Sequence, residues 1–252
     1  MSTGNLAAHE TARRASGHQH LLTAGIFDVD GVLLASPHER AWREALKGFA
    51  DPDHFTTAMY QAQVAGKPRL AGAVAALEAL GVPDAEGRAV AYAERKQERL
   101  EALIAVGAAP AFPDALRFVQ AMGAMGWPMA VASSSKNAND MMKPIRLGSG
   151  QSFLDAFSAN VCGRDLRQGK PNPEIFLLAA AELGVEPASC FVAEDAPAGI
   201  EAARAGGMMA LGVGRLGDAA GLWAAGADIV VTSLNEIAID ELALGRLRRR
   251  SA

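Results

Sequence analysis

Two aspartates follow a short apolar segment near the start of the chain, where residues 25–34 read Gly-Ile-Phe-Asp-Val-Asp-Gly-Val-Leu-Leu. The apolar residues are typical of a buried strand in a parallel sheet, with Asp28 and Asp30 at its carboxyl end. Because side chains at positions i and i+2 of a strand point to the same side, we expect the two carboxylates to converge on one bound group. Gly31 lets the backbone turn sharply, and a metal ion is the simplest cation that would offset the two charges.

Two other interpretations of this segment are open at this point. One is a strand followed by a solvated Asp-Gly turn that binds nothing. The other is a calcium-binding loop, since Glu39 stands at the twelfth position counted from Asp28. Val32 and Leu33 occupy the positions of a ligand and of the invariant glycine in such a loop, which disfavours it. The choice depends on whether later segments supply partners for the acids.

The composition indicates a globular protein whose main partner is neither nucleic acid nor a membrane. At 252 residues the chain can bury a sizeable core, as one large domain or as a domain with an insert. Its net charge of −4 argues against nucleic acid or an anionic membrane surface as the main partner. No apolar segment approaches the roughly twenty residues that span a bilayer. The basic segment 246–250 is interpreted as a solvated tail.

The cysteines and the N-terminal residues favour a cytoplasmic protein. Cys162 and Cys190 lack metal-type spacing, and Cys190 begins an apolar segment that we expect in the core. This usage fits a reducing compartment. The N-terminal segment contains Arg13 and Arg14 but lacks the apolar stretch of a secretory signal. We expect a polar, disordered arm there, whose histidines are not ligands.

Strand and helix signals alternate in the second half of the chain. The spacing predicts strands over 129–132, 157–162, 190–193, 209–213 and 228–231, and helices over 113–126, 174–183 and 197–205. Between the first strand and residue 111 the signals are helical, with helices predicted from residue 37 onward and over 70–80 and 89–106. This alternation implies an α/β fold with a parallel sheet and right-handed crossovers, and the helical block reads as a separate small domain.

Functional side chains gather at the predicted ends of strands, where ligands bind in such sheets. They form four clusters: Asp28 with Asp30, Ser133 to Asn137, Lys170, and Glu194 with Asp195. Phosphoryl transfer to a carboxylate requires such a set, with one acid as nucleophile and a second acid for the proton. Hydroxyl, amide and lysine donors hold the phosphoryl oxygens, and magnesium offsets their charge. Each cluster alone is more often a turn, a surface lysine or an acidic helix start. Their joint occurrence favours a catalytic site.

The chain carries four ordered motifs that resemble those of the haloacid dehalogenase superfamily: Asp-Val-Asp-Gly-Val, Ser-Ser-Ser-Lys-Asn, Gly-Lys-Pro-Asn-Pro-Glu and Glu-Asp-Ala-Pro-Ala-Gly-Ile. Within it, the chain is most similar to the β-phosphoglucomutase-like group, which has a helical cap. The resemblance covers residues 25–233. It implies a Rossmann-like core, with helices on both faces of the sheet, and an inserted all-helical cap. The corresponding domains are a flexible arm over 1–22, the core over 23–35 and 112–240, the cap over 36–111 and a basic tail over 241–252.

By this resemblance, Asp28 would be the nucleophile that becomes an aspartyl-phosphate, and Asp30 would be the general acid/base. Magnesium would be bound by the side chains of Asp28 and Asp195 and by the backbone carbonyl of Asp30, with Glu194 in or next to the coordination shell. The other motif residues would contact the substrate: Ser133 and Lys170 hold the phosphoryl group, and Ser134, Ser135, Lys136 and Asn137 surround the phosphate or the sugar.

The predicted cap supplies two further candidates. The sequence Gly-Lys-Pro-Arg, with Lys67 and Arg69, resembles the cap loop with which β-phosphoglucomutases bind the second phosphate of their substrate. Arg69 matches the arginine of that loop and is suited to a bidentate phosphate contact. His38 matches the linker histidine of the group, which couples substrate binding to activation of the acid/base. An ordinary surface histidine at a helix start is the equally weighted alternative for His38.

Two differences from the β-phosphoglucomutases bear on the activity. The linker over 34–38 is two residues shorter than in the mutases and carries Ala35 and Ser36 in place of an Asp-Thr pair. In the cap loop, Ala65 stands where the mutases carry a lysine just before Gly66. Lys67, on the other side of Gly66, is a candidate substitute for that lysine. Both changes affect the parts that distinguish a mutase from a phosphatase.

We therefore expect a cytoplasmic, magnesium-dependent enzyme that acts on a small phosphorylated sugar as a monomer or weak homodimer. The favoured activity is that of a β-phosphoglucomutase, which interconverts β-glucose 1-phosphate and glucose 6-phosphate. A phosphatase for a small phosphorylated metabolite is the alternative. Dehalogenation would need neither Asp30 nor Asp195. A non-catalytic sugar-phosphate sensor would be expected to lack the nucleophile or the metal-binding acids, which are all present.

Overall fold

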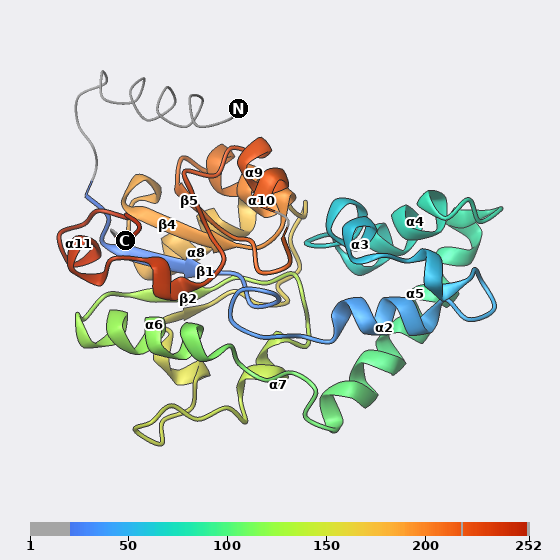
Figure 1. Cartoon of the computed structure of the whole chain (residues 1–252), viewed down its shortest axis with the longest axis horizontal. Coiled ribbons are helices and arrows are strands. Elements are labelled where there is room, and N and C mark those ends of the chain that lie inside the picture. Colours follow the sequence, from blue (N-terminus) through green and yellow to red (C-terminus); the bar gives the residue numbers. More distant parts are fainter. Residues whose placement is uncertain (1–20, 218, 251–252) are drawn as a thin grey trace.

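The computed structural model describes residues 21–217 and 219–250. Its centre is a six-stranded sheet with the order β3-β2-β1-β4-β5-β6, in which every neighbouring pair is parallel (Figure 1). The strands are β1 (Ala24–Phe27), β2 (Met129–Val131), β3 (Ala159–Asn160), β4 (Cys190–Glu194), β5 (Met209–Val213) and β6 (Ile229–Val231). The predicted α/β Rossmann-like fold is confirmed, and β1 lies in the middle of the sheet.

Helices cover both faces of this sheet and bury the side chains that alternate along its strands. Phe27 of β1 belongs to the core on the face covered by α6 and α7, whereas Ile26 belongs to the core beneath α8 and α9. The same alternation holds for Phe191 and Val192 of β4. The helices are α6 (Pro113–Ala124), α7 (Ala138–Met142), α8 (Glu174–Leu183), α9 (Pro197–Ala205), α10 (Ala219–Ala224) and α11 (Ile239–Ala243).

Phe27 is the centre of an aromatic cluster that ties β1 to its surroundings. Its ring lies 5.7 Å from that of Phe191, 5.9 Å from that of Phe157 and 6.1 Å from that of Phe118, measured between centroids. All three pairs are edge-to-face, the geometry that the charge distribution of the rings favours. The residue just before the predicted nucleophile is therefore fixed by packing.

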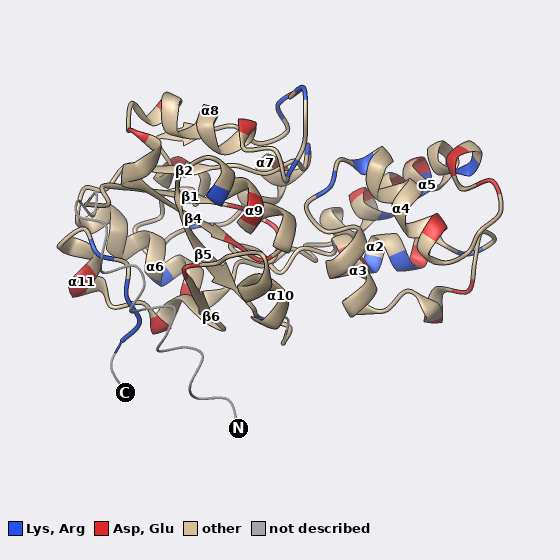
Figure 2. Ribbon diagram, turned by 90° about the horizontal axis from the view of Figure 1, so that it is seen from above, with Lys and Arg blue, Asp and Glu red and all other residues tan. Residues whose placement is uncertain are grey.

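The segment between β1 and α6 is helical and forms a second lobe beside the sheet (Figures 1 and 2). Its helices are α2 (His38–Ala45), α3 (Thr57–Gln63), α4 (Arg69–Ala79) and α5 (Ala85–Ala105), and we call them the cap. The cap has its own core, in which the Tyr92 ring packs 5.1 Å from that of Trp42. The Tyr92 hydroxyl donates to the Trp42 carbonyl at 2.9 Å, which satisfies both buried groups.

The C-terminal end of the chain departs in detail from the predicted division. The predicted boundary at residue 240 falls inside α11, and Leu247 beyond it is buried. The basic segment is held by ion pairs, including one from Arg249 to Glu236. The predicted arm lies outside the described residues except for Leu21 and Leu22. In the described part of the chain, no helix is long and apolar enough to cross a membrane.

Replacing Phe27 by Ala is expected to lower the free energy of unfolding by about 3–5 kcal/mol, because the aromatic cluster would be left with a cavity. Urea unfolding followed by circular dichroism measures the loss. Val106→Ala, at a side chain that is 78% exposed, is the control and should change stability by less than about 0.5 kcal/mol. A loss below about 1 kcal/mol for Phe27→Ala would contradict the central packing role of this ring.

Candidate active site

A tight turn directly after β1 positions the two predicted catalytic aspartates. The Asp28 amide donates to the Ala193 carbonyl at 3.0 Å, which extends the pairing with β4 by one residue. The chain then turns at Gly31, whose φ of 78° is readily adopted only by glycine. The amides of Leu33 and Leu34 both donate to the Val29 carbonyl and close the turn.

A cavity of about 940 Å³ lies between the carboxyl edge of the sheet and the cap. Its size is within the roughly 300–1,000 Å³ of typical ligand pockets. Basic side chains line it from both lobes, Lys67 and Arg69 from the cap and Lys136 and Arg164 from the core. The structure brings all the predicted site residues to this cavity: Asp28, Asp30, His38, Lys67, Arg69, Ser133, Ser134, Ser135, Lys136, Asn137, Lys170, Glu194 and Asp195.

Lys170 is the buried cation at the floor of the cavity. Its Nζ donates to Asp28 Oδ1 at 2.5 Å and to Glu194 Oε1, and all three residues are buried. Burial lowers the pKa of Lys170, but the two carboxylates outweigh burial and raise this pKa above its ordinary value. Burial raises the pKa of Asp28 to about 8, with further increases from Glu194 and Asp30 and a decrease from Lys170.

Glu194 is fixed so that it serves as the second partner of Lys170. Its Oε2 accepts hydrogen bonds from the amides of Asp195 and Ala196, at 3.0 and 3.1 Å. A Cβ at Gly199 would lie 2.0 Å from the Glu194 carboxyl carbon, so only glycine fits there. Gly199 belongs to the Glu-Asp-Ala-Pro-Ala-Gly-Ile motif, but our sequence analysis assigned it no role, although a glycine in the first turn of α9 is an unusual choice and was a visible signal.

The acids of this site fit a divalent cation through their chemistry. Asp195 lies against Gly31, where a Cβ would be 2.0 Å from its Oδ2, and burial followed by the Glu194 charge raises the pKa of Asp195 well above its usual range. Asp30 Oδ1 is buried and accepts no hydrogen bond from any described residue. Asp28 and Glu194 thus share one ammonium, Asp30 and Asp195 line the same cavity, and such oxygen donors are what magnesium prefers. Among the described residues, no three or more acidic, histidine or cysteine side chains form a ready-made metal cluster.

His38 lies inside the cavity, and its side chain is 14% exposed. Its Nε2 is 3.6 Å from Asp30 Oδ1 and 3.3 Å from Ser135 Oγ. Its Nδ1 is 3.0 Å from the Nζ of Lys96 in α5. Burial lowers the pKa of His38 to about 4, and the charge of Lys96 adds to the decrease while that of Asp30 opposes it. His38 therefore connects the cap to the predicted acid/base.

Lys96 is a functional candidate that our sequence analysis missed. It is 3% exposed, and its ammonium lies 5.0 Å from the Trp42 ring centroid, a cation–π contact. Burial lowers the pKa of Lys96 to about 7. A signal was present in the sequence, because Lys96 falls on the buried face of α5 together with Tyr92, Leu100 and Leu103. A charged residue on such a face needs a partner, and His38 is that partner.

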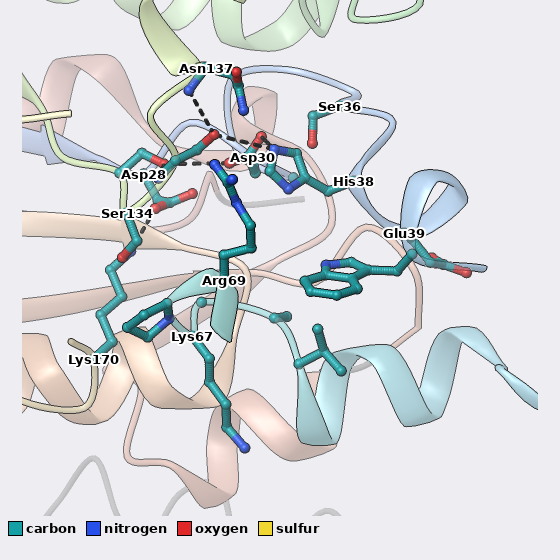
Figure 3. Close-up of a pocket in the computed structure, with 18 of the residues that line it drawn as sticks. Asp28, Asp30, Ser36, His38, Glu39, Lys67, Arg69, Ser134, Asn137 and Lys170 are labelled. Atoms are coloured by element: carbon teal, nitrogen blue, oxygen red, sulfur yellow. Dashed lines mark hydrogen bonds and ion pairs between the residues drawn. The ribbon is translucent and has the colours of Figure 1, made fainter. Parts of the chain in front are cut away.

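The two lobes also meet through a pair of amides. Gln97 of α5 donates to Asn137 Oδ1 at 3.0 Å, and Asn137 donates back to Gln97 Oε1 at 3.3 Å. In Figure 3, Arg69 extends from the start of α4 toward Asp30 and His38, whereas Lys67 extends away from them. The two basic residues of the cap loop thus have different orientations.

The serine motif after β2 faces the aspartates. Ser133 is buried, and its Oγ lies 3.4 Å from Asp30 Oδ2 and accepts from the Ser135 amide at 3.1 Å. Lys136 instead pairs with Asp165 at 3.0 Å, with both side chains largely exposed at the edge of the cavity. The motif therefore places one hydroxyl beside the acid/base candidate and one cation near the entrance.

Comparisons with known proteins agree with this geometry. A family model described as haloacid dehalogenase-like hydrolase matches residues 23–207. A beta-phosphoglucomutase of Mycobacterium tuberculosis is 34% identical and covers 90% of this chain and 96% of its own. A fructose-1-phosphate phosphatase of Escherichia coli is 33% identical over 75% of this chain and 94% of its own. The crystal structure of a beta-phosphoglucomutase from Clostridium difficile has a TM-score of 0.72 at 27% identity, covering 89% of this chain and 97% of its own.

The burial of Lys96 predicts a pH-dependent stability difference. Its pKa is about 7 in the folded protein and 10.5 in the unfolded chain, so between these values the unfolded chain binds more protons and stability rises with pH. The free energy of unfolding of the wild type minus that of Lys96→Met should therefore increase by about 1 kcal/mol per pH unit from pH 7.5 to 9.5. Lys47→Met, which removes an exposed lysine, controls for the substitution. If urea unfolding shows that this difference stays constant or falls as the pH rises, the burial of the Lys96 ammonium is contradicted.

Proposed function

Because this chain belongs to the haloacid dehalogenase-like hydrolase family, within its β-phosphoglucomutase-like group, we propose that it transfers phosphoryl groups through Asp28. The observation that carries this proposal is the buried arrangement at the end of β1. Asp28 is held by Lys170 at 2.5 Å, and the carboxylate of Asp30 lies in the same cavity beside Ser133. One acid is thus held as nucleophile while another is placed for proton transfer.

The residues divide two chemical steps between them. In the first, an Asp28 oxygen attacks phosphorus, the ester P–O bond breaks, and Asp30 gives its proton to the departing oxygen. In the second, an incoming hydroxyl or water attacks the aspartyl-phosphate, Asp30 takes the proton of that nucleophile, and the Asp28 carboxylate is released. Lys170 and Ser133 hold the phosphoryl oxygens throughout, since their nitrogen and hydroxyl donors face the same space.

Magnesium is part of the proposal. Asp28 and Asp195 would hold it by their carboxylates, with the Asp30 backbone carbonyl and Glu194 in or next to the shell. When bound, it would neutralise charge on the phosphoryl oxygens and the acids. The raised pKa values of Asp28 and Asp195 support the proposal, because a cation would favour the ionised forms that the nucleophile requires.

The proposed activity is that of a β-phosphoglucomutase, which converts β-glucose 1-phosphate to glucose 6-phosphate. The mycobacterial and clostridial relatives support it, as does the orientation of Arg69 toward the catalytic acids (Figure 3). We propose that Arg69 binds the second phosphate of a sugar bisphosphate with its planar guanidinium. We propose the remaining predicted residues, Ser134, Ser135, Lys136 and Asn137, as substrate contacts.

A phosphatase for a small phosphorylated sugar is the second candidate. Ala65 occupies the position where the mutases carry a lysine. Lys67, the candidate substitute for that lysine, extends away from Asp30 (Figure 3). A cap with one fewer phosphate contact holds a bisphosphate less firmly and leaves water a better competitor for the aspartyl-phosphate. The fructose-1-phosphate phosphatase relative of Escherichia coli fits this candidate.

One assay separates the two candidates. The protein is incubated with magnesium, β-glucose 1-phosphate and a catalytic amount of β-glucose 1,6-bisphosphate, and both glucose 6-phosphate and free phosphate are followed. Glucose 6-phosphate without matching phosphate release establishes the mutase. Free phosphate alone rejects the mutase and supports the phosphatase. If neither product forms from this or other sugar phosphates, the proposed function is wrong.

Asp28→Asn is expected to abolish turnover, because a neutral amide oxygen lacks the negative charge that makes a carboxylate nucleophilic enough to attack phosphorus. Removal of magnesium with EDTA should have the same effect on the wild type, and added magnesium should restore activity. Circular dichroism and the thermal midpoint should show that the variant is folded. Asp155→Asn, at an exposed acid, is the control and should keep full activity. Magnesium-dependent turnover by Asp28→Asn would contradict the assignment of the nucleophile.

Arg69→Ala should reduce the mutase reaction by about 10²-fold, the usual cost of losing a charge-assisted phosphate contact of roughly 2–3 kcal/mol. Hydrolysis of p-nitrophenyl phosphate, which has no second phosphate, should fall far less. Arg88→Ala, in the cap but outside the cavity, is the matched control. Equal losses of both reactions in Arg69→Ala would remove the role of this arginine in binding a second phosphate.

A further inference from the structure

We propose that Arg215 is a positioning residue that fixes the acid/base Asp30 relative to the nucleophile Asp28. Arg215 lies two residues after β5, and its side chain reaches across the carboxyl edge of the sheet to the turn that follows β1. The inference rests on the proposed phosphoryl transfer, since it assigns a role within that reaction. Neither the sequence motifs nor the proposed mechanism uses this residue.

Arg215 binds the backbone of the catalytic turn at two consecutive carbonyls. Its Nε donates to the Gly31 carbonyl at 3.1 Å, and its Nη2 donates to the Val32 carbonyl at 3.0 Å. Within the described part of the chain, no other group donates a hydrogen bond to either carbonyl. Asp30 directly precedes Gly31, so the conformation of this backbone decides where the Asp30 carboxylate points.

The guanidinium is itself held by a buried acid. Arg215 Nη1 donates to Asp114 Oδ2 at 2.9 Å, and the same oxygen accepts from Ser233 Oγ and the Leu234 amide, both at 2.7 Å. Asp114 is 6% exposed, and although burial raises its pKa, the hydrogen bonds outweigh burial and keep this pKa below its usual value. Asp114 is therefore a charged anchor that orients the fork of Arg215.

Phe112 completes the arrangement from the chain segment that returns from the cap. The Arg215 guanidinium lies 3.9 Å from the centroid of the Phe112 ring, and the Phe112 amide donates to the Leu33 carbonyl at 3.0 Å. Arg215 thus links three segments of the chain: the turn that carries Asp30, the return segment that carries Phe112, and the residues after β5. Lysine would not do this, because a single ammonium lacks the planar fork that reaches two carbonyls and a carboxylate together.

The expected consequence of losing Arg215 is a misplaced acid, not a missing nucleophile. Asp28 keeps the hydrogen bond from its amide to the Ala193 carbonyl and its contact with Lys170. Arg215 takes part in neither interaction. Asp30 would lose the backbone support that follows it. A displacement of about 1 Å can lower a rate by roughly 10²-fold. The effect should appear where protonation of the leaving oxygen limits the rate.

The test compares aryl phosphates whose leaving groups need a proton to different degrees, with magnesium present. For Arg215→Ala, kcat/KM for phenyl phosphate should fall by about 10–100-fold, because its leaving oxygen depends on Asp30. For p-nitrophenyl phosphate, whose leaving group departs without a proton, kcat/KM should fall by less than about threefold. The slope of log kcat/KM against leaving-group pKa becomes steeper, which a loss of folded protein alone would not produce.

Two further variants keep the inference open to refutation if Arg215→Ala folds poorly. Arg215→Lys retains a cation beside Asp114 but not the fork, and should show the same steeper slope. In an Asp30→Asn background, Arg215→Ala should cost kcat/KM for phenyl phosphate no more than about threefold, because the acid to be positioned is already absent. Arg204→Ala is the control, since it removes an arginine ion-paired with Asp228 away from the cavity, and its slope should match the wild type.

An unchanged slope in folded Arg215→Ala and Arg215→Lys would overturn the inference while leaving the proposed function intact. A full additional loss in the Asp30→Asn background would also overturn it, since Arg215 would then act independently of Asp30. If the wild type turns over neither these esters nor any sugar phosphate, the proposed function is wrong, and this inference falls with it.

Discussion

The structure depends on the burial of two carboxylates around a single ammonium group. Asp28 and Glu194 both contact Lys170, and all three are nearly inaccessible to solvent. Such a cluster is stable only if the backbone holds the three charged groups in contact, because unpaired buried charge is costly. Parallel strands supply that backbone: β1 and β4 are paired in register, so that Asp28 and Glu194 leave the sheet side by side. The excess negative charge that remains is what makes the cavity suited to a cation and a phosphate together.

The sequence predicted the central features of the fold because its local signals were strong. The helix predicted over 174–183, with Gly184 at its end, and the helix over 197–205 agree with α8 and α9. The short helices α3, α10 and α11 were not predicted, since five to seven residues carry too little periodicity to be distinguished from a loop. For such segments, tertiary packing decides the structure.

The prediction for the two aspartates was right about their shared location, but the strand ends earlier than expected. We expected strand alternation to bring Asp28 and Asp30 to one side; β1 ends at Phe27, the Asp28 amide still pairs with β4, and Asp30 lies in the turn at Gly31. Lys96 and Arg215 were missed for a different reason. Their partners His38 and Gly31 are 58 and 184 residues away in the chain, and only the folded topology brings them together.

The division of labour between the lobes explains why phosphoryl-transfer chemistry is easier to assign here than its acceptor. The proposed nucleophile directly follows β1, whose pairing with β4 fixes its place. The proposed acid/base and phosphate-holding lysine lie in loops that line the same cavity. In the proposed function the acceptor would be selected by the cap, which reaches the core through the contacts of His38 with Ser135 and of Gln97 with Asn137. These are hydrogen bonds between side chains, each worth only about 1 kcal/mol net. The replacements Ala35, Ser36 and Ala65 lie in the linker and the cap loop, outside the strands of the core. A shared core can therefore serve mutases and phosphatases alike, as the relatives of this chain illustrate.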